Sequence, residues 1–156
     1  MKKAILYILL SVYSSLILNA QDIYGVDVSN FAGSVNWQQV KTAGKTFAWT
    51  RATEGLTYTD PTFITNITGG NNAGVIMGAY HFAKPDISGA VAQADTFLSV
   101  AHPYIGPGYL PPVLDLEEGM SSFSSDSLTN WVQTWMSTVQ NVTGVSPILY
   151  TGQYYA

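Results

Sequence analysis

The sequence predicts an α/β fold in which a parallel β-sheet is covered by helices. Short apolar segments bounded by glycine or proline alternate with helical or polar stretches along the chain. No internal repeat, charge run or low-complexity linker interrupts residues 21–156, which favours a single domain. Such alternation is typical of parallel sheets with crossover helices. The pattern by itself allows either an open doubly wound sheet or a (β/α) barrel.

Five apolar segments are predicted to be buried strands. They cover residues 23–29, 47–53, 75–82, 112–117 and 147–151. Four helices are predicted between them, at residues 37–43, 61–67, 88–100 and 126–142. The first helix ends at Gly44, and Asp60-Pro61 offers the second a cap followed by a proline in the first turn.

The last predicted helix carries an apolar stripe. Its apolar residues recur at steps of three and four, as on one face of a helix. They are Leu128, Trp131, Trp135, Val139 and Val142. We therefore expect Trp131 and Trp135 to lie in the core.

Residues suited to sugar chemistry occur at the end of every predicted strand. In parallel folds, ligands bind at the carboxyl ends of the strands, which meet at one edge of the sheet. These residues are Asp27, Glu54, Tyr80, Asp115 with Glu117, and Tyr150. The sequence therefore predicts that side chains from five strands converge on one site.

Asp115 and Glu117 form the most informative pair of carboxylates. Residues two apart on a strand point to the same face, so the two side chains should project together. Neighbouring carboxylates cannot both ionise easily, which is expected to raise the pKa of one of them. A carboxyl group that stays protonated near neutral pH can protonate a glycosidic oxygen. We predict that Glu117 is the general acid and that Asp115 stabilises or orients the transition state; a solvated carboxylate pair is the alternative.

Three further polar residues are interpreted from their positions in the strands. Asp27 is expected either to join the carboxylate pair or to cap the following loop. Arg51 is expected to be buried and to pair with Asp27 or Asp115. His81 should face away from Tyr80, which favours a buried structural histidine over a catalytic one.

Residues 1–20 have the organisation of a secretory signal peptide. Lys2 and Lys3 precede an apolar run at residues 4–18, and Ala20 is a small residue at the expected cleavage point. A membrane anchor is the alternative, but the run is shorter than the ~20 residues of a bilayer span. We expect a secreted chain that begins near Gln21 and is not attached to a membrane after cleavage.

The composition argues against several classes of protein. Loss of residues 1–20 removes two of the six Lys and Arg residues and none of the ten acidic residues, which lowers the net charge from −4 to −6. Nucleic-acid binding needs cations that displace counterions, so it is not expected. Cysteine is absent, which argues against disulfides and thiolate metal sites. We predict a monomer without metal or cofactor.

Five motifs follow one another in a fixed order along the chain. They are Gly25-Val26-Asp27-Val28-Ser29 followed by Trp37, Arg51-Ala52-Thr53-Glu54-Gly55, Gly78-Ala79-Tyr80-His81-Phe82, Leu114-Asp115-Leu116-Glu117 and Pro147-Ile148-Leu149-Tyr150-Thr151. In this order they resemble glycoside hydrolase family 25, the Chalaropsis-type lysozymes. The resemblance implies an irregular TIM-like (β/α) barrel of five β/α units followed by three strands. Because the chain stops at Ala156, we expect residues 21–156 to be a catalytic domain that lacks the last strands and a C-terminal acidic residue.

The resemblance also implies a function and the residues that carry it. Family 25 enzymes hydrolyse the β-1,4 bond between N-acetylmuramic acid and N-acetylglucosamine, so peptidoglycan glycan strands are the expected partner. Glu117 matches the acid/base of the family, Asp115 its partner and Asp27 the N-terminal active-site aspartate. Glu54, Tyr80 and Tyr150 match positions that line the substrate groove.

Two other functions stay open, as does the mechanism. A chitinase or endo-N-acetylglucosaminidase also uses Asp-x-Glu, although the longer run of alternating aspartates found in family 18 is missing here. A non-catalytic protein that binds wall glycan is the other alternative, but binding alone does not need three carboxylates. Retaining, inverting and substrate-assisted routes are all possible, the last with Asp115 orienting the 2-acetamido group.

Overall fold

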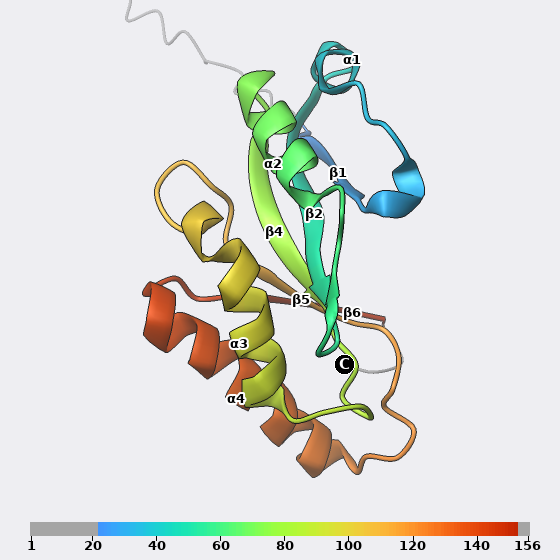
Figure 1. Cartoon of the computed structure of the whole chain (residues 1–156), viewed down its shortest axis with the longest axis vertical. Helices are drawn as coiled ribbons and strands as arrows, with labels where there is room; N and C mark the ends of the chain where they lie inside the picture. Colours follow the sequence, from blue (N-terminus) through green and yellow to red (C-terminus); the bar gives the residue numbers. More distant parts are fainter. Residues whose placement is uncertain (1–21, 153–156) are drawn as a thin grey trace, which may run out of the picture.

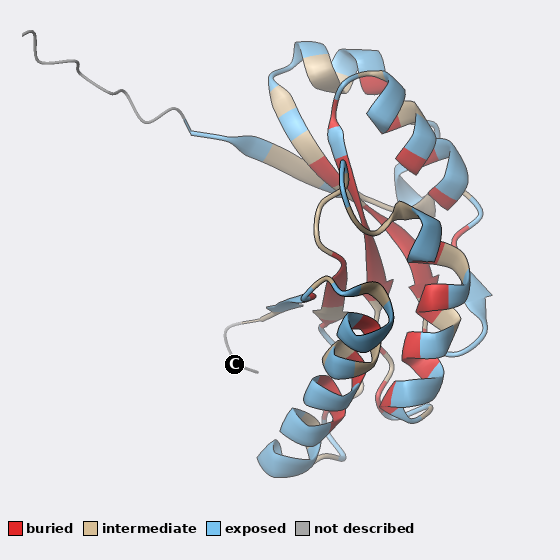
Figure 2. Ribbon diagram, turned by 90° about the vertical axis from the view of Figure 1, so that its left-hand side faces the viewer, coloured by how far each residue is buried: buried red, intermediate tan, exposed pale blue. Residues whose placement is uncertain are grey.

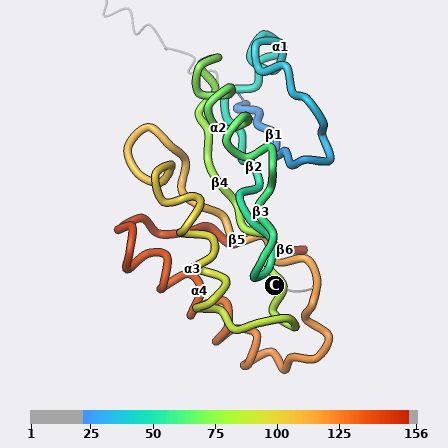
Figure 3. The backbone as a smooth tube through the Cα atoms, in the orientation of Figure 1, coloured from blue at the N-terminus to red at the C-terminus, as the bar shows by residue number. Residues whose placement is uncertain are grey.

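The computed structural model describes residues 22–152, so the predicted signal peptide at residues 1–20 lies outside the described part of the chain. Five parallel strands form one curled sheet with helices packed on its outer side (Figures 1 and 3). In spatial order they are β1 (Tyr24–Val28), β2 (Lys45–Glu54), β4 (Ile76–Phe82), β5 (Val113–Leu116) and β6 (Ile148–Thr151). The sheet is half of a barrel, which confirms the predicted α/β fold and the irregular barrel without its last strands.

A short strand that the sequence does not predict is attached to β2. This strand, β3 (Tyr58–Thr59), pairs antiparallel with the end of β2, where Glu54 lies opposite Tyr58. The turn between them uses Gly55 at a positive φ of 53°, a conformation that glycine adopts without steric cost. Two residues are too few for an alternating pattern to be visible in the sequence.

In the described part of the chain, four α-helices follow the predicted order. They are α1 (Trp37–Thr42), α2 (Phe63–Asn72), α3 (Ala90–Ala101) and α4 (Ser125–Thr143), with short 3-10 helices η1 (Asn30–Ala32) and η2 (His102–Tyr104). The prediction for α2 is wrong at both ends, because the helix begins after Pro61 and continues past Gly69 and Gly70. A Cβ atom on Gly70 would lie 2.1 Å from the Met77 sulfur, so the glycine permits close contact with β4.

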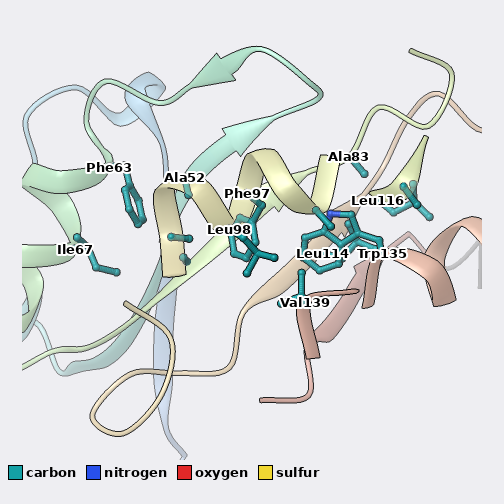
Figure 4. Packing of buried hydrophobic residues seen from close by; sticks show 14 of the residues in the cluster. Ala52, Phe63, Ile67, Ala83, Phe97, Leu98, Leu114, Leu116, Trp135 and Val139 are labelled. Carbon is teal, nitrogen blue, oxygen red and sulfur yellow. The ribbon is translucent and has the colours of Figure 1, made fainter. Parts of the chain in front are cut away.

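The hydrophobic core lies between the outer face of the sheet and the helices, where Figure 2 shows the buried residues gathered. The rings of Phe97 on α3 and Trp135 on α4 lie 5.3 Å apart between centroids, beside Leu114 of β5 (Figure 4). Trp131 is 8% exposed and Trp135 fully buried, which confirms that both tryptophans lie in the core, whereas Val142 at the end of the predicted stripe is exposed. Among the helices of residues 22–152, none is both long and apolar enough to cross a bilayer.

On the inner face of the sheet, aromatic rings of one strand pack against glycines of its neighbours. Phe47 and Trp49 lie two residues apart on β2, and their rings meet edge to face at 5.4 Å between centroids. A Cβ atom on Gly25 would lie 2.1 Å from the Phe47 ring, and one on Gly78 would lie 2.6 Å from the Trp49 ring. These glycines therefore leave space for the two rings, which cover the inner face of the half-barrel below the predicted site.

Candidate active site

The register of the sheet brings the predicted site residues into neighbouring positions. Asp115 on β5 lies between Phe82 on β4 and Tyr150 on β6, and Tyr80 lies beside Arg51 one layer below. Residues paired laterally between strands point to the same face of a sheet. Asp115 and Tyr150 therefore share the inner face, as the sequence predicts.

A groove of about 440 Å³ opens on this inner face. Five of the six predicted site residues line it, and they come from four strands and the end of β5: Asp27, Tyr80, Asp115, Glu117 and Tyr150. Apolar residues complete its walls, among them Phe47, Trp49 and Val113. The groove thus combines a few polar groups with apolar walls, which is the usual composition of a small-molecule site.

Asp115 is the most strongly perturbed carboxyl group of the groove. Burial and the charges of Glu117 and Asp27 together raise its pKa to about 7, against the opposing charge of Arg51. Its Oδ1 atom is buried and has no hydrogen-bond partner among residues 22–152. Buried carboxylates are ordinarily held by hydrogen bonds, so an unpaired one in a groove indicates a functional site. The predicted rise in the pKa of one member of the pair therefore falls on Asp115.

Glu117 lies one residue beyond β5 and is exposed at the rim of the groove. It lines the same groove as Asp115, as the alternation of side chains along a strand predicts. Tyr150 lines the groove beside Glu117, and the charge of Glu117 raises the pKa of Tyr150. Glu117 is thus the carboxylate with the freest access to a ligand that enters from solvent.

Tyr80 on β4 and Asp27 on β1 also line the groove. Burial and the charges of Asp115 and Asp27 raise the pKa of Tyr80 to about 12, against the opposing charge of Arg51. The Ser29 side chain, in the loop that follows β1, lies close enough to the Tyr80 hydroxyl to lower this pKa in part. Asp27 is exposed on β1 and faces the groove. Tyr80 therefore stays a neutral hydrogen-bonding group throughout the ordinary pH range.

Arg51 is buried, as predicted, but the predicted partners are wrong. Its Nε donates to the Asp60 carboxylate at 3.1 Å and its Nη1 to Glu54 at 2.8 Å, rather than to Asp27 or Asp115. The register of β2 against β4 shifts between residues 51 and 53, and the guanidinium lies against the turn after β1 and against Tyr58 of β3. The spacing of residues along the predicted strands could not predict the pairing with Asp60, because the β2–β3 hairpin places that residue beside Arg51.

Asp60 is the buried carboxylate that holds Arg51, whereas the sequence predicts it only as a helix cap. It is 2% exposed, and its oxygens accept from the Arg51 side chain, the Asn30 backbone and both the backbone and hydroxyl of Thr62. Burial alone would raise its pKa, but the hydrogen bonds from Thr62, Asn30 and Arg51 outweigh that effect and lower it. Asp60 is therefore a permanent carboxylate that ties three segments together.

Glu54 differs from the other predicted site residues because it does not line the groove. It pairs with Arg51 and, at 3.3 Å, with the Lys84 ammonium, which also pairs with Glu118. The Glu118 side chain is 51% exposed and lies on the rim away from the groove lining. Glu54 thus belongs to a charged network that joins the ends of β2, β4 and β5.

His81 is fully buried on the helix side of β4, which confirms the structural interpretation. Its Nδ1 lies 2.8 Å from the Thr53 hydroxyl, and its Nε2 lies 2.9 Å from the Gln93 side-chain oxygen. Burial lowers its pKa to about 4, with the Gln93 hydrogen bond opposing. Residues 22–152 contain no group of three or more His, Cys, Asp or Glu side chains placed to hold a metal ion.

The sequence matches one protein family over nearly its whole described length. The family model described as glycosyl hydrolases family 25 matches residues 26–156. Lysozyme M1 of Streptomyces globisporus is 39% identical over an alignment of 140 residues that covers 83% of this chain and 46% of that protein. An N,O-diacetylmuramidase of Chalaropsis sp is 36% identical over 138 residues, 83% of this chain and 65% of that protein. The chain thus spans about half to two thirds of the length of these relatives.

Solved structures give the same result. The muramidase from Trichobolus zukalii superposes with a TM-score of 0.81 at 37% identity, over 86% of this chain and 67% of that one. The bacterial lysozyme from Streptomyces coelicolor superposes with a TM-score of 0.78 at 38% identity, over 85% of this chain and 64% of that one. Sequence, half-barrel sheet and the carboxylates in its groove agree, and the chain belongs to glycosyl hydrolases family 25.

Proposed function

We propose that this chain is a lysozyme that hydrolyses the β-1,4 bond between N-acetylmuramic acid and N-acetylglucosamine in peptidoglycan. The observation that carries the proposal is the convergence of Asp27, Asp115 and Glu117 on one groove, where a buried oxygen of Asp115 has no hydrogen-bond partner within residues 22–152. Three carboxylates around an apolar-walled groove exceed what sugar binding needs, and acid-assisted bond cleavage uses them.

Glu117 is assigned as the general acid. Its exposed position at the rim lets it reach the oxygen between two sugar rings, whereas Asp115 lies deeper and partly buried. Glu117 donates a proton to the glycosidic oxygen as the bond from that oxygen to the anomeric carbon breaks. Water supplies the hydroxyl at the anomeric carbon. Its proton returns to Glu117 in the retaining and substrate-assisted routes and goes to the second carboxylate in the inverting route. The proton donation by Glu117 to the glycosidic oxygen is common to all three routes.

Asp115 and Asp27 are assigned the role of stabilising the positive charge that develops on the sugar. The raised pKa of Asp115 keeps one proton within the Asp115 and Glu117 pair up to about pH 7, so the acid is available near neutrality. When the proton resides on Glu117, the Asp115 carboxylate can orient a 2-acetamido group. Tyr80 and Tyr150 add hydroxyl groups and flat walls to the same groove.

The proposal also covers how the chain reaches peptidoglycan and in which oligomeric state it acts. The positive start and apolar run of residues 1–20 support export through a signal peptide, which would bring the chain to peptidoglycan outside the cell. We propose that it acts there as a monomer. The chain is expressed with its intact leader, and the culture medium is tested for the secreted protein. N-terminal sequencing then tests the cleavage point, and light scattering tests the monomer. A mature start other than near Gln21 contradicts the cleavage assignment.

Product analysis tests the proposed reaction. Peptidoglycan digested with the chain is reduced with borohydride, and the new sugar ends are identified by mass spectrometry. Reduced muramic acid ends are expected from the wild type and from Glu118→Gln, the matched neighbour on the rim, but not from Glu117→Gln. Reduced glucosamine ends would indicate a glucosaminidase, and tight binding without new ends would indicate a non-catalytic glycan-binding protein.

A further inference from the structure

A phenylalanine ring lies almost bare at the edge of the sheet that carries the groove. Phe31 is 85% exposed, although it sits in the ordered η1 turn directly after β1. A side chain so exposed contributes little hydrophobic burial, so its effect on folding is small. Exposed aromatic residues beside a groove are a common feature of ligand-binding surfaces.

One face of the Phe31 ring is held by a cation. The Arg51 guanidinium lies 5.3 Å from the Phe31 centroid and 5.2 Å from the Tyr58 centroid, so it contacts both rings. Arg51 is itself fixed by hydrogen bonds to Asp60, Glu54 and Asn30. Because the guanidinium is fixed by these hydrogen bonds, its cation–π contact holds the ring in place while most of the ring surface stays open.

The turn that carries Phe31 is fixed from its backbone as well. The Asn30 amide donates to Asp60 at 2.9 Å, and the Ser29 hydroxyl accepts from the Phe31 amide at 3.4 Å. A ring held in this way loses little conformational freedom when a ligand stacks on it, so preorganisation favours binding.

The ring is connected to the groove through its own chain. Phe31 follows Asp27 by four residues, a separation of at most about 14 Å along an extended chain. Ser29 lies between them, close enough to the Tyr80 hydroxyl of the groove to influence the pKa of Tyr80. A long polymer that occupies the groove would therefore pass within reach of Phe31.

We propose that Phe31 is a stacking platform for a pyranose ring of the glycan strand, outside the groove in which the bond is cleaved. The proposal rests on the lysozyme function proposed above. The flat apolar face of a sugar ring matches the open face of the phenyl ring, and the phenyl ring itself carries no charge that must be desolvated. Phe31 thereby selects for longer glycan strands.

Binding of defined glycans tests this platform. Peptide-free tetrasaccharides and octasaccharides of alternating N-acetylglucosamine and N-acetylmuramic acid are titrated against the full chain in a Glu117→Gln background. Phe31→Ala is expected to weaken octasaccharide binding about fivefold, the usual scale of one aromatic contact, and to change tetrasaccharide binding less than twofold. Phe31→Trp should restore the octasaccharide affinity.

Tyr24→Ala is the matched control. Tyr24 is also an exposed aromatic residue beside a cation, with the Lys45 ammonium 5.0 Å from its ring, but it lies at the opposite end of β1. Its removal should leave both affinities unchanged, and thermal melts should show that all variants are folded.

The outcomes separate this proposal from the proposed function. Equal octasaccharide affinity with and without Phe31→Ala in the Glu117→Gln background overturns the platform alone, provided that the chain with Glu117 intact releases muramic acid ends. A Phe31 defect that appears only with peptide-bearing strands also overturns it, because the ring would then contact the stem peptide. A chain that neither binds nor cleaves either glycan overturns both proposals.

Discussion

The Asp60 carboxylate accepts hydrogen bonds from Arg51 on β2 and from the Asn30 backbone with the same oxygen, at 3.1 and 2.9 Å. One buried ion pair therefore joins the end of β2, the start of the loop before α2 and the turn after β1. Because Phe31 and Ser29 belong to that turn, the pair also sets the position of one side of the groove.

Arg51→Lys should destabilise the fold although it keeps the charge. A single ammonium cannot reproduce hydrogen bonds in three directions, and Asp60 would remain buried with part of its partners lost. We expect a loss of about 2–4 kcal/mol in the free energy of unfolding, measured by urea denaturation. Asp60→Asn should cost a similar amount, and the double variant should cost less than the sum. Strict additivity would contradict a shared network.

Asp115 should make the folded state less stable as the pH rises. Its pKa is about 7 in the folded chain and near 4 when unfolded, so the folded state binds more protons between these values. Its contribution is therefore fully present below pH 4 and is lost as the pH rises through 7. His81 acts in the opposite direction between about pH 4 and 6.5, because its folded pKa is the lower one.

The Asp115 contribution is isolated by comparing variants. The stability of Asp115→Asn relative to wild type should improve between pH 5 and pH 8 by on the order of 1 kcal/mol, after allowance for solvent screening. Urea denaturation at both pH values measures it, with the exposed Asp126→Asn as control. An Asp115→Asn difference that does not change with pH would show that this carboxyl ionises normally.

Hydrolysis should decline above about pH 7. The Asp115 and Glu117 pair must hold a proton for the glycosidic oxygen, and the raised pKa of Asp115 sets the upper limit. In Asp115→Asn, Glu117 loses its charged neighbour, so the descending limb of kcat/KM should move to lower pH. The measurement is release of reducing ends across pH 4–9. A limb that stays in place would assign it to another group.

Gly78→Ala should destabilise the inner layer of the half-barrel. The new methyl group would lie 2.6 Å from the Trp49 ring and 2.8 Å from the Leu110 Cβ. Overpacking of this kind typically costs about 1–3 kcal/mol. Combining the change with Trp49→Leu should recover part of the loss in thermal denaturation, since the clash is with that ring. No recovery would place the strain in the backbone instead.

Trp135→Ala should be among the most destabilising substitutions in α4. The side chain is fully buried and stacks on His81 at 5.6 Å and against Phe97 at 5.3 Å. Removing a buried tryptophan costs about 3–5 kcal/mol. Val142→Ala on the same predicted stripe should cost less than about 0.5 kcal/mol, because Val142 is 56% exposed. Similar losses for both, measured by denaturation, would contradict this packing.

The sequence by itself determined the order of strands and helices, because hydrophobic periodicity and turn residues are local signals. The strand segments, the α4 stripe and the placement of Asp115 with Glu117 on one face follow from such patterns. The parallel sheet follows in turn, since alternating strands and helices connect in few other ways. The prediction of a buried His81 has the same origin.

Only the tertiary structure decided which charges meet. Sequence spacing could not show that a two-residue strand, β3, carries Asp60 to Arg51, or that Lys84 draws Glu54 away from the groove lining. Nor could it show which carboxyl of the pair has the raised pKa. That depends on burial and on the hydrogen bonds Asp115 lacks among the described residues, and both are properties of the folded surroundings rather than of neighbours in the chain.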